Sequence, residues 1–131
     1  MSLTIATTLN TDFQDAVQRT REALSEVGFG VLTEIDMTAT LKKKIDADIE
    51  DYLILGACNP GFAHRALQVE RQVGALLPCN VTVRRNPDNA DEVIVEAVDP
   101  RTLMAAAGNE DLTAAADEVS ELLTKAIGSL R

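Results

Sequence analysis

The sequence of 131 residues has no tryptophan, one tyrosine, three phenylalanines and one histidine. Proteins that hold single-stranded nucleic acid stack bases on aromatic side chains, and few are present here. Basic residues are also scarce, because 12 lysines and arginines stand against 21 aspartates and glutamates, a net charge of −9. Such a chain repels phosphate backbones, and its one dense basic run, Lys42-Lys43-Lys44, is typical of a solvated helix face. Composition therefore argues against a nucleic-acid partner.

Long apolar segments are missing as well. No run approaches the ~20 residues that a membrane-spanning helix needs, and the first residues, Met1–Thr4, lack the basic and apolar regions of a signal peptide. We therefore expect no membrane association and a cytoplasmic location. The length fits a single domain over residues 1–131 that can bury its own core.

Cysteine occurs only at Cys58 and Cys79. Their separation matches neither a redox Cys-x-x-Cys motif nor a zinc-finger spacing, and in the cytoplasm both are expected to be reduced thiols. Both are followed by asparagine, as Cys58-Asn59 and Cys79-Asn80, and each pair lies where an apolar run meets a turn signal. These two Cys-Asn pairs are therefore the main candidates for a site.

Hydrophobic periodicity predicts five strands and five helices in the order β-α-β-α-β-α-β-β-α-α. This order indicates an α/β or α+β fold, with a single-layer mixed sheet of about five strands packed by helices. The last helix carries a long apolar stripe, which could serve the core or a dimer interface. The expected strands are 3–9, 29–37, 52–57, 79–85 and 92–98, and the expected helices are 13–27, 38–46, 60–70, 100–107 and 112–130.

Cys58 is expected at the end of a strand and just before a helix. The positive end of a helix stabilises a thiolate, so this thiol could be a nucleophile, although a small buried residue in a tight turn fits the same pattern. Asn59 fits a helix cap better than a ligand. Cys79 shares the strand parity of neighbouring valines, which favours burial, while Asn80 points to the opposite face and could line a pocket.

Glu34 and Asp36 fall on one face of the second predicted strand, where they could form a carboxylate pair or a cation site. A polar strand face that leads into a helix is the simpler explanation, because acidic pairs at this spacing are common on exposed strands. A structural zinc site needs four ligands, and Cys58, Cys79 and His64 supply at most three. A catalytic zinc could use three ligands and a water, so Cys58 and Cys79 stay candidate metal ligands. Whether the cysteines share one edge depends on strand direction: they do if strand 79–85 runs antiparallel to 52–57.

The segments Phe29–Asp36, Tyr52–Pro60 and Leu76–Val81, together with Ala97–Pro100, resemble the DUF302 family of uncharacterised proteins. The resemblance covers nearly the whole chain, and the Cys-Asn pairs are its most specific part. It implies a small bacterial or archaeal α/β domain, often a homodimer, with no assigned activity. His64 matches no motif position of the family.

Three functions fit these observations. The first is a homodimer that binds a small ligand or a metal ion near the Cys-Asn pairs, with Glu34 and Asp36 as further candidates. The second is a thiol-dependent enzyme with Cys58 as the nucleophile. The third is a structural or regulatory dimer module that uses the apolar stripe of the last helix. Binding is favoured over catalysis because no general base is assured near either thiol. No cofactor is identified.

Overall fold

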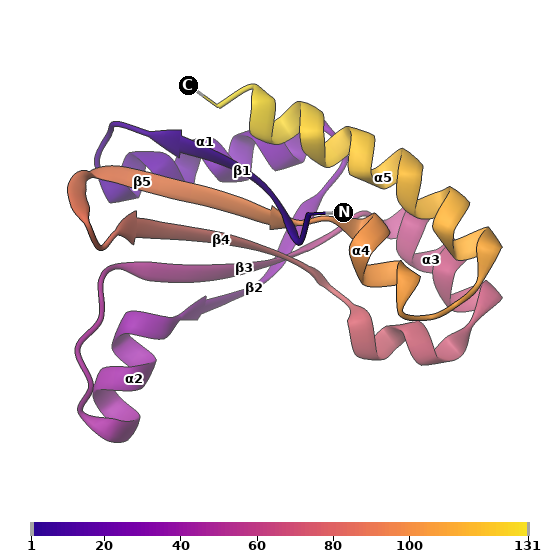
Figure 1. Cartoon of the computed structure of the whole chain (residues 1–131), viewed down its shortest axis with the longest axis horizontal. Coiled ribbons are helices and arrows are strands. Elements are labelled where there is room, and N and C mark those ends of the chain that lie inside the picture. Colours follow the sequence, from indigo (N-terminus) through magenta and orange to yellow (C-terminus); the bar gives the residue numbers. More distant parts are fainter. Residues whose placement is uncertain (1, 131) are drawn as a thin grey trace.

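The computed structural model describes residues 2–130, which form one five-stranded sheet and its helices. The strand order is β1-β5-β4-β3-β2, and every neighbouring pair is antiparallel (Figure 1). Across these residues, no helix is both long enough and apolar enough to cross a membrane. The strands are β1 (Thr4–Leu9), β2 (Gly30–Asp36), β3 (Tyr52–Cys58), β4 (Cys79–Asn86) and β5 (Asn89–Val98). The helices are α1 (Phe13–Glu26), α2 (Met37–Ile45), α3 (Pro60–Val69), α4 (Pro100–Ala105), α5 (Glu110–Gly128) and the short 3₁₀ helix η1 (Arg71–Leu76).

The α/β class and the element order predicted from the sequence are confirmed. The strand directions are more uniform than the expected mixed sheet, and the connections explain why. The helix α2, and the pair α3 and η1, each join strands that are neighbours in the sheet, so the chain returns beside the strand that it has just left. The helix α1 instead carries the chain from β1 at one edge to β2 at the other.

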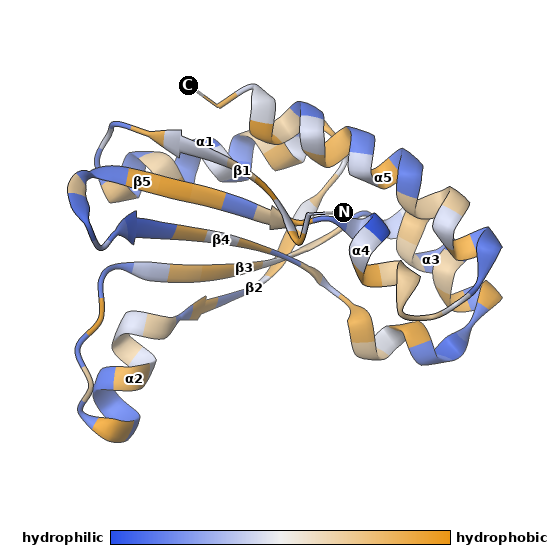
Figure 2. Cartoon of the chain, in the orientation of Figure 1, coloured by the Kyte–Doolittle hydropathy of each residue, from blue (hydrophilic) through white to orange (hydrophobic). Residues whose placement is uncertain are grey.

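The core lies on one side of the sheet, where α1 and α5 pack (Figure 1). Alternate residues of the central strands, such as Leu55 and Val81, are fully buried there, as the period of two in a strand requires. Hydrophobic and hydrophilic residues alternate along α5 (Figure 2), and its apolar residues Leu123 and Ile127 are 0% and 2% exposed. The apolar stripe of the last helix is therefore part of the core, and the expectation that it forms a dimer interface is wrong.

The other face of the sheet, called the open face below, holds side chains of which none is fully buried. The helix α2 projects away from the ends of β2 and β3 and buries none of its residues (Figure 1). Residues of this face that are register partners on neighbouring strands form rows across the sheet. These rows are Thr4 and Val98; Ala6, Glu96, Thr82, Ile54 and Ile35; Thr8, Ile94, Arg84 and Tyr52; and Asn80 and Thr33.

Side-chain caps begin the helices. Asn59 caps α3 by accepting a hydrogen bond from the backbone nitrogen of Phe62 at 3.1 Å, as the sequence predicts. Asp36 caps α2, which begins at Met37, one residue before the expected helix 38–46. Thr38 is engaged elsewhere, because its hydroxyl donates to the carbonyl of Glu50 at 2.7 Å and ties α2 to the start of β3.

Candidate functional site

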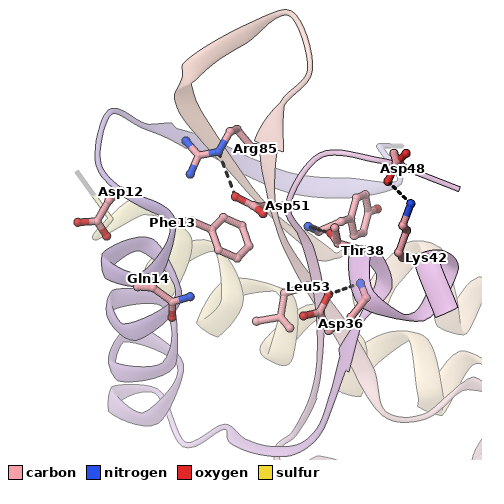
Figure 3. Close-up of a pocket in the computed structure, with 12 residues that line it drawn as sticks. Asp12, Phe13, Gln14, Asp36, Thr38, Lys42, Asp48, Asp51, Leu53 and Arg85 are labelled. Atoms are coloured by element: carbon pink, nitrogen blue, oxygen red, sulfur yellow. Dashed lines mark hydrogen bonds and ion pairs between the residues drawn. The ribbon is translucent and has the colours of Figure 1, made fainter. Parts of the chain in front are cut away.

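A cavity of about 740 Å³ opens between α1 and α2, at the end of the sheet where β3 begins (Figure 3). This volume lies within the range of small-molecule sites, roughly 300–1,000 Å³. Four separate segments line the cavity: the start of α1, the junction of β2 with α2, the start of β3 and the end of β4. The lining residues are Asp12, Phe13, Gln14, Asp36, Thr38, Ala39, Lys42, Asp48, Asp51, Tyr52, Leu53 and Arg85.

Two aspartates of this lining are helix caps. The carboxylate of Asp12 accepts a hydrogen bond from the backbone nitrogen of Asp15 at 2.7 Å, and that of Asp36 accepts one from Ala39 at 2.9 Å. Both bonds satisfy free N–H groups at the positive end of a helix. The same local interaction that begins each helix therefore fixes a carboxylate beside the cavity.

Phe13 and Leu53 supply apolar surface between these carboxylates (Figure 3). Leu53 is buried and Phe13 packs against the core, so both are held in place from behind. The guanidinium of Arg85 lies over the Phe13 ring, 5.9 Å from its centroid, which is within the range of a cation–π contact. The cavity thus has an apolar floor and a charged rim.

The two basic residues of the rim are already paired. Lys42 Nζ lies 2.9 Å from Asp46 and 3.2 Å from Asp48, and these hydrogen bonds raise the pKa of Lys42. Arg85 Nε lies 3.3 Å from the carboxylate of Asp51, and another of its nitrogens donates to a carbonyl on β5. The rim therefore has no basic group without an anionic or carbonyl partner.

Asp12 and Asp36 stand in contrast to these cations. Within residues 2–130, neither carboxylate has a lysine, arginine or histidine nitrogen within ion-pair distance, and both residues are exposed. The lining counts four aspartates against two basic residues. The cavity is therefore acidic, and the acidic excess comes from the two helix caps.

The Cys-Asn pairs lie at the other end of β3. The strand runs from Tyr52 to Cys58, so they are ~20 Å from the cavity. Because β3 and β4 are antiparallel, Cys58 and Cys79 do share one edge of the sheet. Cys79 is the register partner of Ala57, so its side chain points to the core face and that of Cys58 points to the open face.

The two thiols have different surroundings. Cys79 is 2% exposed, and burial, with a smaller effect of Cys58, raises its pKa to about 11. Cys58 is half-buried and lies two residues after Gly56, where the side chains of Thr33 and Pro78 leave no room for a Cβ atom. Asn80 is exposed and is the register partner of Gly56, so it lies on the same face as Cys58.

The remaining sequence-predicted residues are dispersed. Glu34 forms an ion pair with Arg21 of α1, so of the two strand carboxylates only Asp36 lines the cavity. His64 is exposed on α3. In the part of the chain that the structure describes, no three histidine, cysteine, aspartate or glutamate side chains lie close enough to hold a metal ion.

Phe13, Asp51 and Arg85 were not among the residues predicted from the sequence. They come from α1, from the segment before β3 and from β4, and no local motif joins them. Asp12 had one available signal, since an aspartate directly before a predicted helix is a preferred cap.

We expect one fast and one slow thiol in the native protein. A thiol reagent such as DTNB should modify Cys58 at neutral pH and reach Cys79 only after unfolding, because Cys79 is buried and has little thiolate at that pH. Absorbance of the released product measures both rates, and Cys58→Ser should remove the fast phase. Two equal rates in the folded protein would contradict this assignment.

The burial of Cys79 also makes the stability of the folded protein depend on pH. Its native pKa is raised from 9.0 to about 11, so it favours the native state in full below the unfolded pKa. That contribution is lost as the pH rises from about 9 towards 11.

The chain is similar to known proteins over nearly its whole length. A family described as "Domain of unknown function DUF302" matches residues 5–130. The crystal structure of an uncharacterized conserved DUF302 protein from Bacillus stearothermophilus has 26% sequence identity, covers 100% of both chains and superimposes with a TM-score of 0.91. A comparison with curated proteins gives no match. The chain therefore belongs to the DUF302 family, as the resemblance of its Cys-Asn segments indicates.

Proposed function

We propose that this domain binds a small organic molecule in the cavity between α1 and α2. The observation that carries the proposal is the lining itself, an apolar floor of Phe13 and Leu53 inside a rim of charged groups. Binding sites for small molecules commonly combine such a floor with a few polar groups that orient the ligand. Of the residues predicted from the sequence, Asp36 is part of this site.

Binding suits this cavity better than catalysis. The Thr38 hydroxyl and the basic groups are committed to structure, because Thr38 bridges α2 and β3, Lys42 pairs with Asp46, and Arg85 pairs with Asp51. The thiol of Cys58, the candidate nucleophile, lies at the far end of β3. A thiol reaction in this cavity would therefore need a group that the cavity lacks within residues 2–130.

A matched trio of small aromatic probes tests the proposal: phenethylamine, phenethyl alcohol and phenylpropionate. We expect at least one probe to shift the amide NMR signals of Phe13, Ala39 and Leu53. Tyrosine fluorescence gives a second readout, because Tyr52 is the only tyrosine, there is no tryptophan, and Tyr52 lines the cavity. If all three probes leave these signals unmoved, the cavity is not a binding site.

We also propose that two copies associate through their open faces, which is a specific form of the homodimer implied by the family. Within the paired rows defined above, the face carries one arginine and one glutamate, Arg84 and Glu96, which pair at 2.7 Å, so these rows are neutral in a chain of net charge −9. Glu92 has the same strand parity but lies beyond the last of these rows, at the edge of the face. Two acidic copies approach with least repulsion through a neutral surface. A two-fold axis near this pair would also set Arg84 of one copy against Glu96 of the other.

Ile54 lies near the middle of the open face, between Ile35 and Thr82 in the strand register. We expect Ile54→Asp to give folded monomers where the unaltered chain is dimeric, because it places an unpaired carboxylate inside the interface. Val69→Asp is the matched control, since Val69 is an exposed apolar residue of α3. Sedimentation equilibrium measures the mass. A monomeric unaltered chain, or a dimer that survives Ile54→Asp, would contradict the proposed interface.

A further inference from the structure

We infer that the ligand of the α1–α2 cavity is an organic cation: a protonated amine or a quaternary ammonium attached to an apolar group. This inference rests on the binding function proposed above and adds the chemical class. The cavity has two parts, and the ligand should match both. Its charged group lies at the rim beside Asp36 or Asp12, which stand on opposite sides of the floor, and its apolar group covers Phe13 and Leu53.

The charges at the rim determine whether the cavity favours a positively or a negatively charged ligand. The cations Lys42 and Arg85 already pair with Asp46, Asp48 and Asp51, so an incoming anion would have to compete with these carboxylates. Asp12 and Asp36 accept backbone hydrogen bonds but have no cationic partner within residues 2–130. A positively charged group at the rim, beside either carboxylate, would supply that partner.

Helix N-termini ordinarily attract anions, and two of them border this cavity. Here both are occupied. Asp12 caps α1 and Asp36 caps α2, so each helix already has a carboxylate bonded to one of its free N–H groups. A second anion would meet the cap carboxylate instead of the helix dipole. The local structure therefore opposes the usual preference and favours a cation.

An inorganic divalent cation fits the cavity poorly. Such ions need several oxygen ligands converging on one point. No cluster of three histidine, cysteine or acidic side chains with that geometry occurs among residues 2–130. The caps instead stand on either side of the apolar floor (Figure 3), an arrangement that suits a larger cation with carbon atoms to bury.

The probe trio separates this inference from the proposed binding function. The three probes share an aromatic ring and differ mainly in charge, so their order of affinity reports the sign that the cavity selects. Affinities come from the shifts of the Phe13, Ala39 and Leu53 amide signals. At low ionic strength, we expect phenethylamine to bind about ten-fold more tightly than phenethyl alcohol, and phenylpropionate to bind most weakly. Added salt should reduce this preference, because the rim is exposed.

Asp12→Asn and Asp36→Asn test the residues. Asparagine caps a helix as well as aspartate does, so both variants should fold while losing one charge each. Each should weaken phenethylamine binding about three- to five-fold and leave phenethyl alcohol binding nearly unchanged. Glu26→Gln is the matched control, because it removes one charge at the far end of α1, ~20 Å from Asp12.

The outcomes are distinct. Equal or tighter binding of phenethyl alcohol or phenylpropionate in the cavity would overturn the cationic class and leave the binding function standing. Loss of phenethylamine affinity in Glu26→Gln as large as in Asp36→Asn would also overturn it, because net charge alone would then explain the preference. If none of the three probes shifts the cavity signals, the binding function fails and the inference fails with it.

Discussion

Replacing Asp99 with alanine is expected to lower the free energy of unfolding by about 3 kcal/mol. Asp99 is 2% exposed and is the acidic residue of the core. Its carboxylate accepts hydrogen bonds from the backbone and guanidinium of Arg101 and from the hydroxyl of Ser120 at 3.0 Å. These bonds join the end of β5, the start of α4 and the middle of α5. Alanine leaves Ser120 unpaired in the core and removes the cap of α4.

Thermal unfolding measures the loss, and a shift of about 10 °C is expected for a chain of this size. Asp88→Ala, in the exposed β4–β5 turn, is the control and should change the free energy of unfolding by less than about 0.5 kcal/mol. An equally small effect of Asp99→Ala would show that this hydrogen-bond network does not hold the three elements together.

The contribution of Asp99 should also depend on pH. Burial alone raises the pKa of Asp99, but the hydrogen bonds from Arg101 and Ser120 outweigh burial, and the pKa lies below its ordinary value. A lowered native pKa means that the unfolded state takes up the proton first. The stabilisation is therefore complete above the unfolded pKa, about 3.9, and is lost as the pH falls through the native pKa. The stability difference between the unaltered chain and Asp99→Ala should narrow in acid.

Gly56→Ala is expected to destabilise the protein by about 2–3 kcal/mol, because it overpacks the end of β3. A Cβ atom at this position would lie 2.1 Å from the hydroxyl oxygen of Thr33 and 2.8 Å from the ring of Pro78. The threonine can rotate its side chain away, whereas the proline ring is rigid. The end of β3 must therefore shift where it meets the segment that carries Pro78.

Gly30→Ala is the matched control in the neighbouring strand, since a Cβ there meets nothing within 4 Å. It should be neutral or stabilising by about 0.4–1 kcal/mol, because alanine restricts the unfolded chain. Adding Thr33→Ala to Gly56→Ala should recover part of the loss, which denaturant titration can measure. Equal effects of Gly30→Ala and Gly56→Ala would mean that close packing does not explain the glycine.

Much of the fold could be predicted because the signals are local. A period of two along β4 correctly placed Cys79 with Val81 and Val83 on the buried face, and the apolar stripe of α5 correctly predicted a long helix. Asn59 was predicted as a cap from its place before Pro60, and it is one. Each of these features depends on residues that are neighbours in sequence.

The site could be predicted less well because it depends on strand pairing. The sequence left open whether the two Cys-Asn pairs meet, and antiparallel pairing brings them to one edge while strand parity directs the cysteine side chains to opposite faces. Glu34 and Asp36 are equivalent in the sequence pattern. Only the packing of α1 against the sheet joins Glu34 to Arg21 and leaves Asp36 beside the cavity.

The amino-acid sequence by itself thus determined the helices, the strands and their buried faces, because hydrophobic period and capping act over a few residues. It also determined the family, through the segments that carry the Cys-Asn pairs. Tertiary structure alone decided the antiparallel order of the sheet, the separation of the thiols and the cavity between α1 and α2. Asp12, Phe13, Asp36 and Arg85 meet there because α1 crosses the sheet from β1 to β2, a contact between distant segments that no local pattern encodes.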